Sequence, residues 1–477
     1  MANDNGGIIG IINTPTADTA SGVWSLDSQY QAQTTGTWPP IPAIGLNSAR
    51  FNDGSSDNLT KTFSTDGTSA DIGTISMWLK RSLISSEQVI LSAGTSARDF
   101  FRFESDDTLT FRRVSTYQLT TSQVFRDVSA WYHIVLAFDT TQSTASDRIK
   151  LYVNGSQVTA FGTASYPSQD LDIKIGSAQL NAIGKDSEQN TPYFDGYMSD
   201  VNFVDGQQLD PTSFGAFNAN GVWAPIIPTV SSYGTNGFRL KFENSANLGE
   251  DSSPNGNNFT VNNLTSVDQS GDYPVNNFAT LNPLSKVGSA TFSNGNLTYT
   301  YVNDSGTAGT MGVTKGKWYW EYKFVGTSNV AVAGIIDASI IPTTNINNTG
   351  TAGYYPLGSS AWKDTTEVTT GLSGYSDGMI IGLAFDADNG DIYTWVNGVA
   401  ENSGNAIITG LDTTKTWLPF TCTGNPNINL NFGNGFFGTT AVASAQNPDD
   451  GIGIFEYDVP AGYRALCTKS INAQEYS

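Results

Sequence analysis

The chain has 477 residues and carries 44 acidic against 23 basic side chains, which gives a formal net charge of −21. Nucleic acids and anionic membrane surfaces are bound through clustered Lys and Arg, so this balance excludes both as main partners. Aromatic residues make up 12% of the chain, which excludes a disordered protein and supplies apolar side chains for packed cores.

The first 45 residues differ from the rest because they contain several prolines and show no alternating strand pattern. They include Trp24 and Trp38, and no local pattern would bury these rings. A segment that cannot bury its own apolar side chains often packs them against a partner chain. We therefore expect residues 1–45 to form an extended anchor, with a loosely packed terminus as the alternative. The segment lacks the basic start of a signal peptide, and the sequence shows no apolar run long enough for membrane insertion.

Short runs of alternating apolar and polar residues dominate the chain after residue 45, separated by clusters of Gly, Asn, Asp and Ser. Two of these runs are residues 74–80 and 148–153, whose apolar faces are Ile75, Met77 and Leu79, and Ile149, Leu151 and Val153. Alternation with period two is typical of half-buried strands, and no convincing run keeps helical spacing over three turns. The pattern predicts an all-β fold of the sandwich type.

Two matching hairpins indicate two separate sandwiches. Residues 148–155 and 391–398 both end a strand in Val-Asn-Gly. Asn-Gly suits a two-residue type I′ turn, because both central residues need positive φ. A Pro- and Asn-rich tract at residues 218–283 lies between the hairpins. We expect this tract to be a structured connector between a first sandwich at 46–217 and a second at 284–477.

The motifs of the first sandwich resemble those of laminin-G/concanavalin A-like jelly rolls. The matching runs follow one another at residues 51–59, 74–78, 131–135, 151–155 and 194–201. The resemblance implies a jelly-roll sandwich of the lectin-like kind.

The second sandwich resembles a SPRY domain. The matching runs are residues 316–322, 377–386, 397–398 and 429–433, followed by a last strand at 463–467. The resemblance implies a bent β-sandwich that binds partners through its loops and has no catalytic residues of its own.

Further stretches look like parts of bacteriophage tail-fibre and capsid-associated proteins, particularly those of marine phages. They are residues 21–26 and 36–39 near the N-terminus, and residues 249–260 and 276–283 in the connector. The resemblance implies that the anchor joins other capsid or tail proteins of the virion, with contact residues Trp24, Leu26, Trp38 and Pro39. It also implies assembly in the host cytoplasm, a place on the virion surface and a homo-oligomer, for which we expect a trimer.

His133 is the only histidine, which excludes a HExxH zinc helix and any multi-histidine metal site. Alternation along its strand places it beside Trp131 and Val135, so we expect a structural imidazole. The two cysteines, Cys422 and Cys467, are too few for a disulfide framework. We expect reduced thiols, with one bond between them as the alternative.

Other motifs for catalysis or metal binding fail on their context. Residues 374–378 fit the G-x-S-x-G elbow of hydrolases, but an apolar strand follows where that motif needs a helix. The Glu-x-Asp-x-Glu strand motif of retaining glycosidases does not occur. Residues 386–391 predict a turn, because Asn397 stands where a calcium loop needs its bidentate Glu. We expect no catalytic residue, metal site or cofactor, with a structural calcium ion near Asp195 or Asp200 left open.

Aromatic and amide side chains in loop-like stretches are the remaining candidates for ligand binding. Sugars present apolar ring faces and many hydroxyls, which aromatic rings beside amides can bind. The candidate ligand-binding residues are Tyr354, Tyr355, Trp362, Tyr393 and Trp395 in the second sandwich, and Tyr117 and Tyr193 in the first. Ordinary packing within the sandwiches is the alternative for each of them.

These inferences combine into one hypothesis and its alternatives. We expect a non-enzymatic virion surface protein, either a capsid decoration or head fibre or a tail fibre, that adheres to host-surface glycans or decorates the particle. The alternatives are a glycan depolymerase on the virion, a purely structural cement protein, and a cellular SPRY-type binding module.

Overall fold

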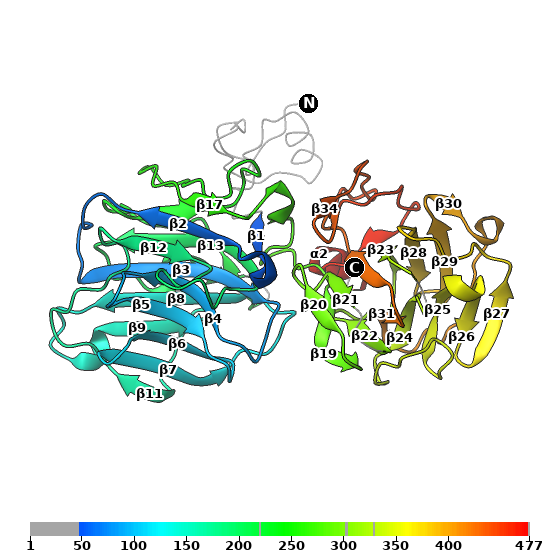
Figure 1. Ribbon diagram of the computed structural model, residues 1–477, viewed down its shortest axis with the longest axis horizontal. Coiled ribbons are helices and arrows are strands. Elements are labelled where there is room, and N and C mark those ends of the chain that lie inside the picture. The colour runs from blue at the N-terminus through cyan, green and yellow to red at the C-terminus, as the bar shows by residue number, and fades with distance from the viewer. Residues whose placement is uncertain (1–46, 219–220, 301–303, 328–329, 476–477) are drawn as a thin grey trace, which may run out of the picture.

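The computed structural model describes residues 47–218, 221–300, 304–327 and 330–475. These residues form two β-sandwiches that lie side by side, as the all-β prediction requires (Figure 1). The predicted anchor, with Trp24, Leu26, Trp38 and Pro39, lies outside the described residues.

The first sandwich consists of two antiparallel sheets, here called 1A and 1B, that face each other across one core. In spatial order, sheet 1A contains β10 (Ser156–Gln157), β9 (Ile149–Val153), β8 (Tyr132–Asp139), β3 (Ile72–Arg81), β13 (Gly196–Asp205), β1 (Ser48–Phe51) and β18 (Gln269–Ser270), and β16 (Phe238–Leu240) also pairs with β13. Sheet 1B contains β11 (Phe161–Ser165), β7 (Tyr117–Val124), β6 (Thr108–Arg113), β5 (Asp99–Phe103), β4 (Gln88–Ala93), β12 (Leu180–Ile183), β2 (Asn58–Thr62) and β17 (Thr260–Asn262).

Strands from residues 218–283 complete the first sandwich. Strands β16 and β18 join sheet 1A, and β17 joins sheet 1B. The physical reason is apolar burial, because Phe238, Leu240, Phe242 and Phe259 all enter the core between the two sheets. The predicted connector therefore contributes structure to the first sandwich. A short hairpin of β14 (Gly215–Phe217) and β15 (Trp223–Pro225) lies outside the sandwich core.

The second sandwich also has two sheets, 2A and 2B. Sheet 2A contains β19 (Leu281–Val287), β22 (Ser305–Gly309), β31 (Trp417–Thr423), β24 (Ala333–Asp337), β25 (Thr351–Tyr355), β26 (Ser360–Lys363) and β27 (Thr366–Thr370). Sheet 2B contains β20 (Thr291–Ser293), β21 (Thr298–Thr300), β32 (Asn427–Asn431), β23 (Lys317–Val325), β28 (Ile380–Asp386), β29 (Asp391–Val396) and β30 (Val399–Ala400), and β35 (Arg464–Ala465) pairs with β23 in parallel. A small hairpin joins β33 (Phe436–Phe437) to β34 (Thr440–Ala441).

Helical structure among the described residues is short. It comprises the α-helix α2 (Thr468–Glu475) and the 3-10 turns η1 (Asp53–Ser55), η2 (Ala145–Asp147), η3 (Pro211–Ser213), η4 (Ser266–Asp268), η5 (Pro356–Gly358) and η6 (Asn402–Gly404). No helix in this part of the chain has the length and apolar character needed to cross a bilayer.

The alternation along central strands decides which side chains enter each core. In β23, Trp318, Trp320 and Tyr322 point into the core of the second sandwich, while Tyr319 lies in a separate cluster on the outer face of sheet 2B. Glu321 alternates with the inward residues and is fully buried on the outer side.

The two predicted hairpins have the expected turns. In the first, φ is 48° at Asn154 and 81° at Gly155, and in the second it is 49° at Asn397 and 81° at Gly398. In each case the asparagine Oδ1 accepts a hydrogen bond from a backbone N–H of the preceding strand, that of His133 at 2.8 Å or Ile380 at 2.9 Å. Positive φ at both central positions confirms the type I′ prediction.

Charged side chains hold the two sandwiches together at a contact that we call the junction. The ammonium of Lys80, on the outer face of sheet 1A, donates to Asp272 Oδ2 at 2.8 Å, Asn277 Oδ1 at 2.7 Å and the Phe278 carbonyl at 3.1 Å. Trp131 Nε1 donates to the other oxygen of Asp272 at 3.0 Å. Lys80 is 1% exposed and Asp272 0%, so this ion pair is desolvated and fully hydrogen-bonded.

A second set of contacts crosses the junction beside the first. Arg50, which donates to Asp268 of the first sandwich at 2.9 Å, places its guanidinium 4.0 Å from the centroid of the Phe436 ring in the second sandwich. Tyr197 donates its hydroxyl to the Gly295 carbonyl at 3.0 Å. The sandwiches are thus joined by directional, buried contacts that fix their relative orientation.

Candidate functional site

His133 is a structural imidazole, as its strand position predicts. It is fully buried, and Trp223 Nε1 donates to its Nδ1 at 2.9 Å. Nε2 therefore carries the proton and donates to Ser76 Oγ at 2.9 Å. Trp78 stacks on the ring with a centroid distance of 4.7 Å. Burial lowers the pKa of His133 to about 3, so the neutral ring is the stable form at neutral pH.

Two of the predicted ligand-binding aromatics are core residues. Tyr354 is 0% exposed and lies in the core of the second sandwich, where its hydroxyl donates to the Ser373 carbonyl. Tyr117 is 2% exposed and lies in the core of the first sandwich. The expectation that these residues lie in loop-like stretches is wrong, because Tyr117 begins β7 and Tyr354 lies within β25, each with its ring on the inward side.

Tyr393 and Trp395 share the outer face of sheet 2B, and a later segment covers them. We call residues 443–463 the C-terminal strap. The two rings pack against a cluster that includes Tyr319 from the sheet and Phe455 and Tyr463 from the strap. Both are half-buried, so their main role is to seat the strap.

Glu321 holds the strap through backbone amides. Its carboxylate accepts hydrogen bonds from the N–H groups of Glu456 and Tyr457, each at 3.0 Å. Asn431 donates to it at 3.0 Å and the Tyr319 hydroxyl at 3.2 Å. Burial raises the pKa of Glu321 to about 7, although these donors act in the opposite direction.

Tyr355 and Trp362 are half-buried on the outer face of sheet 2A. In the register of β25 and β26, Trp362 lies opposite Gly353 and Tyr355 lies opposite Ser360. The two rings are therefore diagonal neighbours on one face, a separation that aromatic side chains can bridge. Both rest on a small apolar cluster that includes Ile336. Among the predicted residues, this pair shares a sheet face that does not belong to the cluster under the strap.

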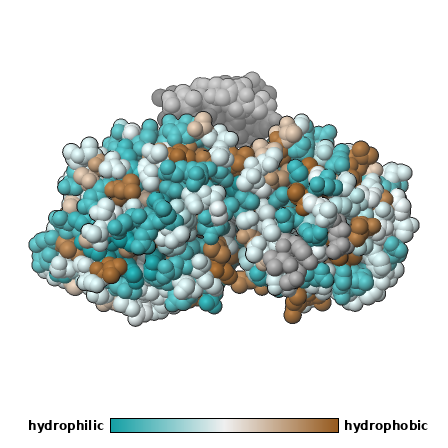
Figure 2. Space-filling view, in the orientation of Figure 1, coloured by the Kyte–Doolittle hydropathy of each residue, from teal (hydrophilic) through white to brown (hydrophobic). Residues whose placement is uncertain are grey.

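Tyr193 is isolated from the other candidates. It is half-buried and forms a single backbone bridge with Lys185 at the edge of the first sandwich. Figure 2 shows a mainly hydrophilic or neutral surface, with apolar residues in small scattered groups.

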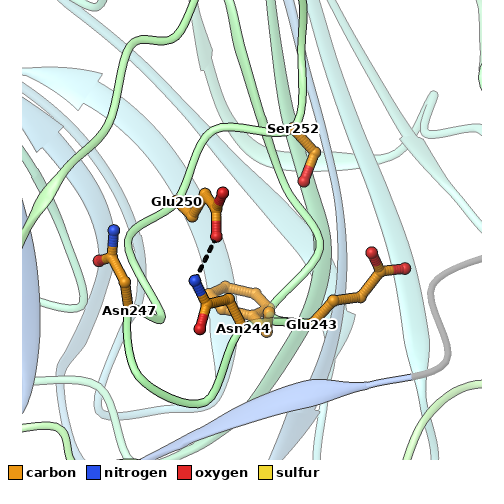
Figure 3. A pocket seen from close by; sticks show the side chains of 6 residues that line it. Glu243, Asn244, Asn247, Glu250 and Ser252 are labelled. Carbon is orange, nitrogen blue, oxygen red and sulfur yellow. Dashed lines mark hydrogen bonds between the residues drawn. The ribbon is translucent and has the colours of Figure 1, made fainter.

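One surface pocket is lined by carboxylates and amides from a single turn, residues 242–252 (Figure 3). Its volume is about 250 Å³. Asn244 donates to Glu250 at 2.6 Å, while Glu243 pairs with Lys241 at 2.7 Å. Figure 3 shows Glu243 pointing away from Glu250, so the two carboxylates do not face a common point.

The acidic residues considered for calcium have different surroundings. Asp200 pairs with Arg239 at 2.6 Å. Asp195 is buried beside Asp53, and burial raises the pKa of Asp195 well above its usual range. In the described residues, no group of three or more His, Cys, Asp or Glu side chains is gathered as metal ligands.

The remaining sequence motifs have structural roles. Strand β28 follows residues 374–378, as predicted for a motif that is not a nucleophile elbow. Asp386 accepts hydrogen bonds from the backbone of Asp388 and Asn389, which closes the predicted turn. Cys422 and Cys467 are both free and buried.

Sequence reasoning missed the groups that hold the outer faces together. Lys80 and Glu321 both stand at outward positions of strands whose other residues are almost all buried. A charged residue in such a strand is itself a signal of a cover, because a buried charge needs hydrogen-bond partners. The sequence did not identify those partners, which lie 192 and 135 residues away along the chain.

Comparison with known proteins finds a family similar to the first sandwich. Residues 53–210 match the family described as the concanavalin A-like lectin/glucanases superfamily (Laminin_G_3). This match agrees with the predicted jelly roll. No curated protein matches the chain.

Two solved structures similar to this chain are SPRY domains. The SPRY domain of human HERC1 is 18% identical with a TM-score of 0.28, and the match covers 31% of this chain and 96% of that chain. The PSpry domain of TRIM65 is 15% identical with a TM-score of 0.27, and the match covers 32% of this chain and 89% of that chain. The proteins named in these comparisons include no bacteriophage protein.

Proposed function

We propose that this chain is a non-enzymatic binding protein of a bacteriophage particle, which displays two locked sandwiches for adhesion to host-surface glycans or for decoration of the particle. The observation that carries the binding role is the partly exposed aromatic pair Tyr355 and Trp362 on sheet 2A. Aromatic faces of this kind suit the apolar faces of sugar rings. The phage assignment rests on the resemblance of residues 21–26, 36–39, 249–260 and 276–283.

The surroundings of the buried carboxylates support a role without catalysis. Glu321 has a raised pKa, as a general acid would, but four hydrogen-bond donors from the strap and its own sheet occupy its carboxylate. Asp272 is likewise occupied by Lys80 and Trp131. Neither group is open to a substrate in this conformation. A depolymerase would need two carboxyl groups that lie close together and are accessible to the substrate.

The anchoring role is tested by truncation. Removal of residues 1–45 should leave both sandwiches folded, since the cores form within residues 49–466. We expect the truncated chain to be absent from purified particles while the full chain is incorporated. Normal incorporation of the truncated chain would contradict the anchor.

The adhesion role is tested with surface polysaccharide from the host. Co-sedimentation of the full chain with polysaccharide should be lost in a Tyr355→Ala/Trp362→Ala variant. Phe217→Ala is the matched control, because this ring is 62% exposed on the first sandwich. Size-exclusion chromatography of the polysaccharide after incubation tests catalysis. Shortened chains would favour the depolymerase, and incorporation into particles without any polysaccharide binding would favour a cement role.

A further inference from the structure

We propose that a pocket at the junction binds a single neutral saccharide unit. The pocket has a volume of about 370 Å³ and lies where residues 271–278 meet residues 433–454 and Lys469. Ligand sites in proteins favour such places between domains, and their volumes begin at about 300 Å³. The site is separate from the aromatic pair on sheet 2A. The inference rests on the proposed function only for its choice of ligand class.

An unpartnered acceptor lines this pocket. Asn434 is 7% exposed, and its Nδ2 donates to Ser270 Oγ at 3.4 Å. Its Oδ1 is buried without a hydrogen-bond partner. A buried amide oxygen left unpaired costs free energy, so a ligand that donates one hydrogen bond to it gains that energy on binding. A hydroxyl group of a sugar is such a donor.

Donors for the oxygens of the same ligand come from Lys469. Its Nζ donates to the Tyr273 hydroxyl at 2.8 Å and lies 5.3 Å from the centroid of that ring. An ammonium group has three donors, and Lys469 forms no ion pair with a carboxylate in the described parts of the chain. The pocket therefore offers both an acceptor and a donor, which is the pattern that hydroxyl groups match.

The walls of the pocket fit a ring with apolar faces. Tyr273, Ile452 and Ile454 supply apolar surface, and glycines leave room between them. A Cβ atom added at Gly271 or at Gly451 would meet no atom within 4 Å, so side chains at these positions would extend into free space. The net charge of −21 disfavours anionic ligands. A neutral sugar unit satisfies all of these features.

The test uses the full chain and small saccharide probes. Saturation-transfer NMR would be recorded with methyl glucoside, methyl galactoside and glucuronate at millimolar concentrations. We expect at least one neutral glycoside to bind. Asn434→Ala should weaken binding about tenfold, the loss of one hydrogen bond to the ligand. Gly271→Trp should abolish binding by filling the pocket without removing a core contact. Asn425→Ala is the matched control, since this exposed amide bonds Thr327 outside the pocket.

The possible results of this experiment distinguish a failure of the pocket assignment from a failure of the proposed adhesion role. Binding that persists in Gly271→Trp, binding of glucuronate alone, or no binding of any probe would overturn the pocket assignment. Thermal unfolding of each variant verifies that a loss of binding is not a loss of fold. If host polysaccharide binds but the probes do not, the pocket assignment fails and the adhesion role stands. If the probes bind through Asn434 but host polysaccharide does not, the adhesion role fails and the pocket stands.

Discussion

In each sandwich, the glycine of the Val-Asn-Gly hairpin lies under an aromatic ring from a later segment. We call that segment the cover, because it packs on the outer face of a sheet. In the first, the ring of Trp223 lies over Gly155, and a Cβ atom there would come within 2.6 Å of it. In the second, Tyr457 lies over Gly398, and the corresponding distance is 2.7 Å. Both glycines have φ of 81°, so the type I′ turn and the close approach of a ring require the same residue.

The covers differ in how they are fixed. Trp223 is held by a side-chain hydrogen bond to the neutral imidazole of His133, whereas the strap that carries Tyr457 is held by backbone amides on Glu321. The first needs an unprotonated nitrogen, whereas the second covers an acidic group whose charged form is disfavoured by burial. The comparison teaches that one packing solution can depend on groups with opposite responses to pH.

The largest expected effect comes from the buried ion pair between Lys80 and Asp272 at the junction. Lys80→Ala would leave the carboxylate of Asp272 buried without its cation, and we expect a loss of about 3–5 kcal/mol in the free energy of unfolding. Urea denaturation measures it. The matched control is Lys150→Ala, whose pair with Asp147 is exposed and contributes about 0–1 kcal/mol. Equal losses in both variants would show that the junction does not hold the sandwiches.

The cover of the first sandwich should weaken in acid. The pKa of His133 is lowered from 6.5 to about 3, so the folded state binds fewer protons than the unfolded state in that window. Its contribution is present above pH 6.5 and is lost as the pH falls toward 3, with about 3 kcal/mol gone by pH 4.5. Hydrogen exchange of β14 and β15 should accelerate over this range. A His133→Gln variant that keeps the full acid dependence would contradict the assignment.

The cover of the second sandwich should respond in the opposite sense. The pKa of Glu321 is raised from 4.5 to about 7, so the folded state binds more protons than the unfolded state between these values. Its contribution is full below pH 4.5 and is lost as the pH rises through 7, by about 2–3 kcal/mol. The measurement is hydrogen exchange of strap peptides, compared between the wild type and Glu321→Gln. It separates the effect of Glu321 from that of Asp57, whose pKa is also raised but which lies in the first sandwich. Strap exchange that slows with rising pH, after correction for intrinsic rates, would count against it.

The smallest expected effect tests whether the glycines of the two hairpins have equivalent roles. Gly155→Ala and Gly398→Ala should each cost about 1–3 kcal/mol, because the new Cβ atom meets a ring and φ is positive. Gly462→Ala is the matched control, since its φ is also 81° but no atom lies within 4 Å of the added Cβ. Thermal unfolding compares the three variants. If the control loses as much as the others, the rings contribute nothing to the requirement for glycine.

Strand periodicity and turn chemistry predicted the fold because they are local. The faces of residues 74–80 and 148–153 are as expected, and the Asn-Gly turns have the geometry that their residue types favour. The exposure of Tyr354 and Tyr355 was not predictable in the same way. Sheet 2A carries apolar clusters on both faces, so alternation alone does not say which of two adjacent tyrosines is inside.

The junction also bears on how the chain engages an extended surface. Because the contacts of Lys80 with Phe278 and of Arg50 with Phe436 fix one sandwich against the other, a second contact made after the first would occur at an effective concentration set by geometry, with no flexible linker to search. Under the proposed adhesion role, avidity would depend steeply on spacing: epitopes at the matching separation would be held by both sandwiches, and epitopes at other separations by only one.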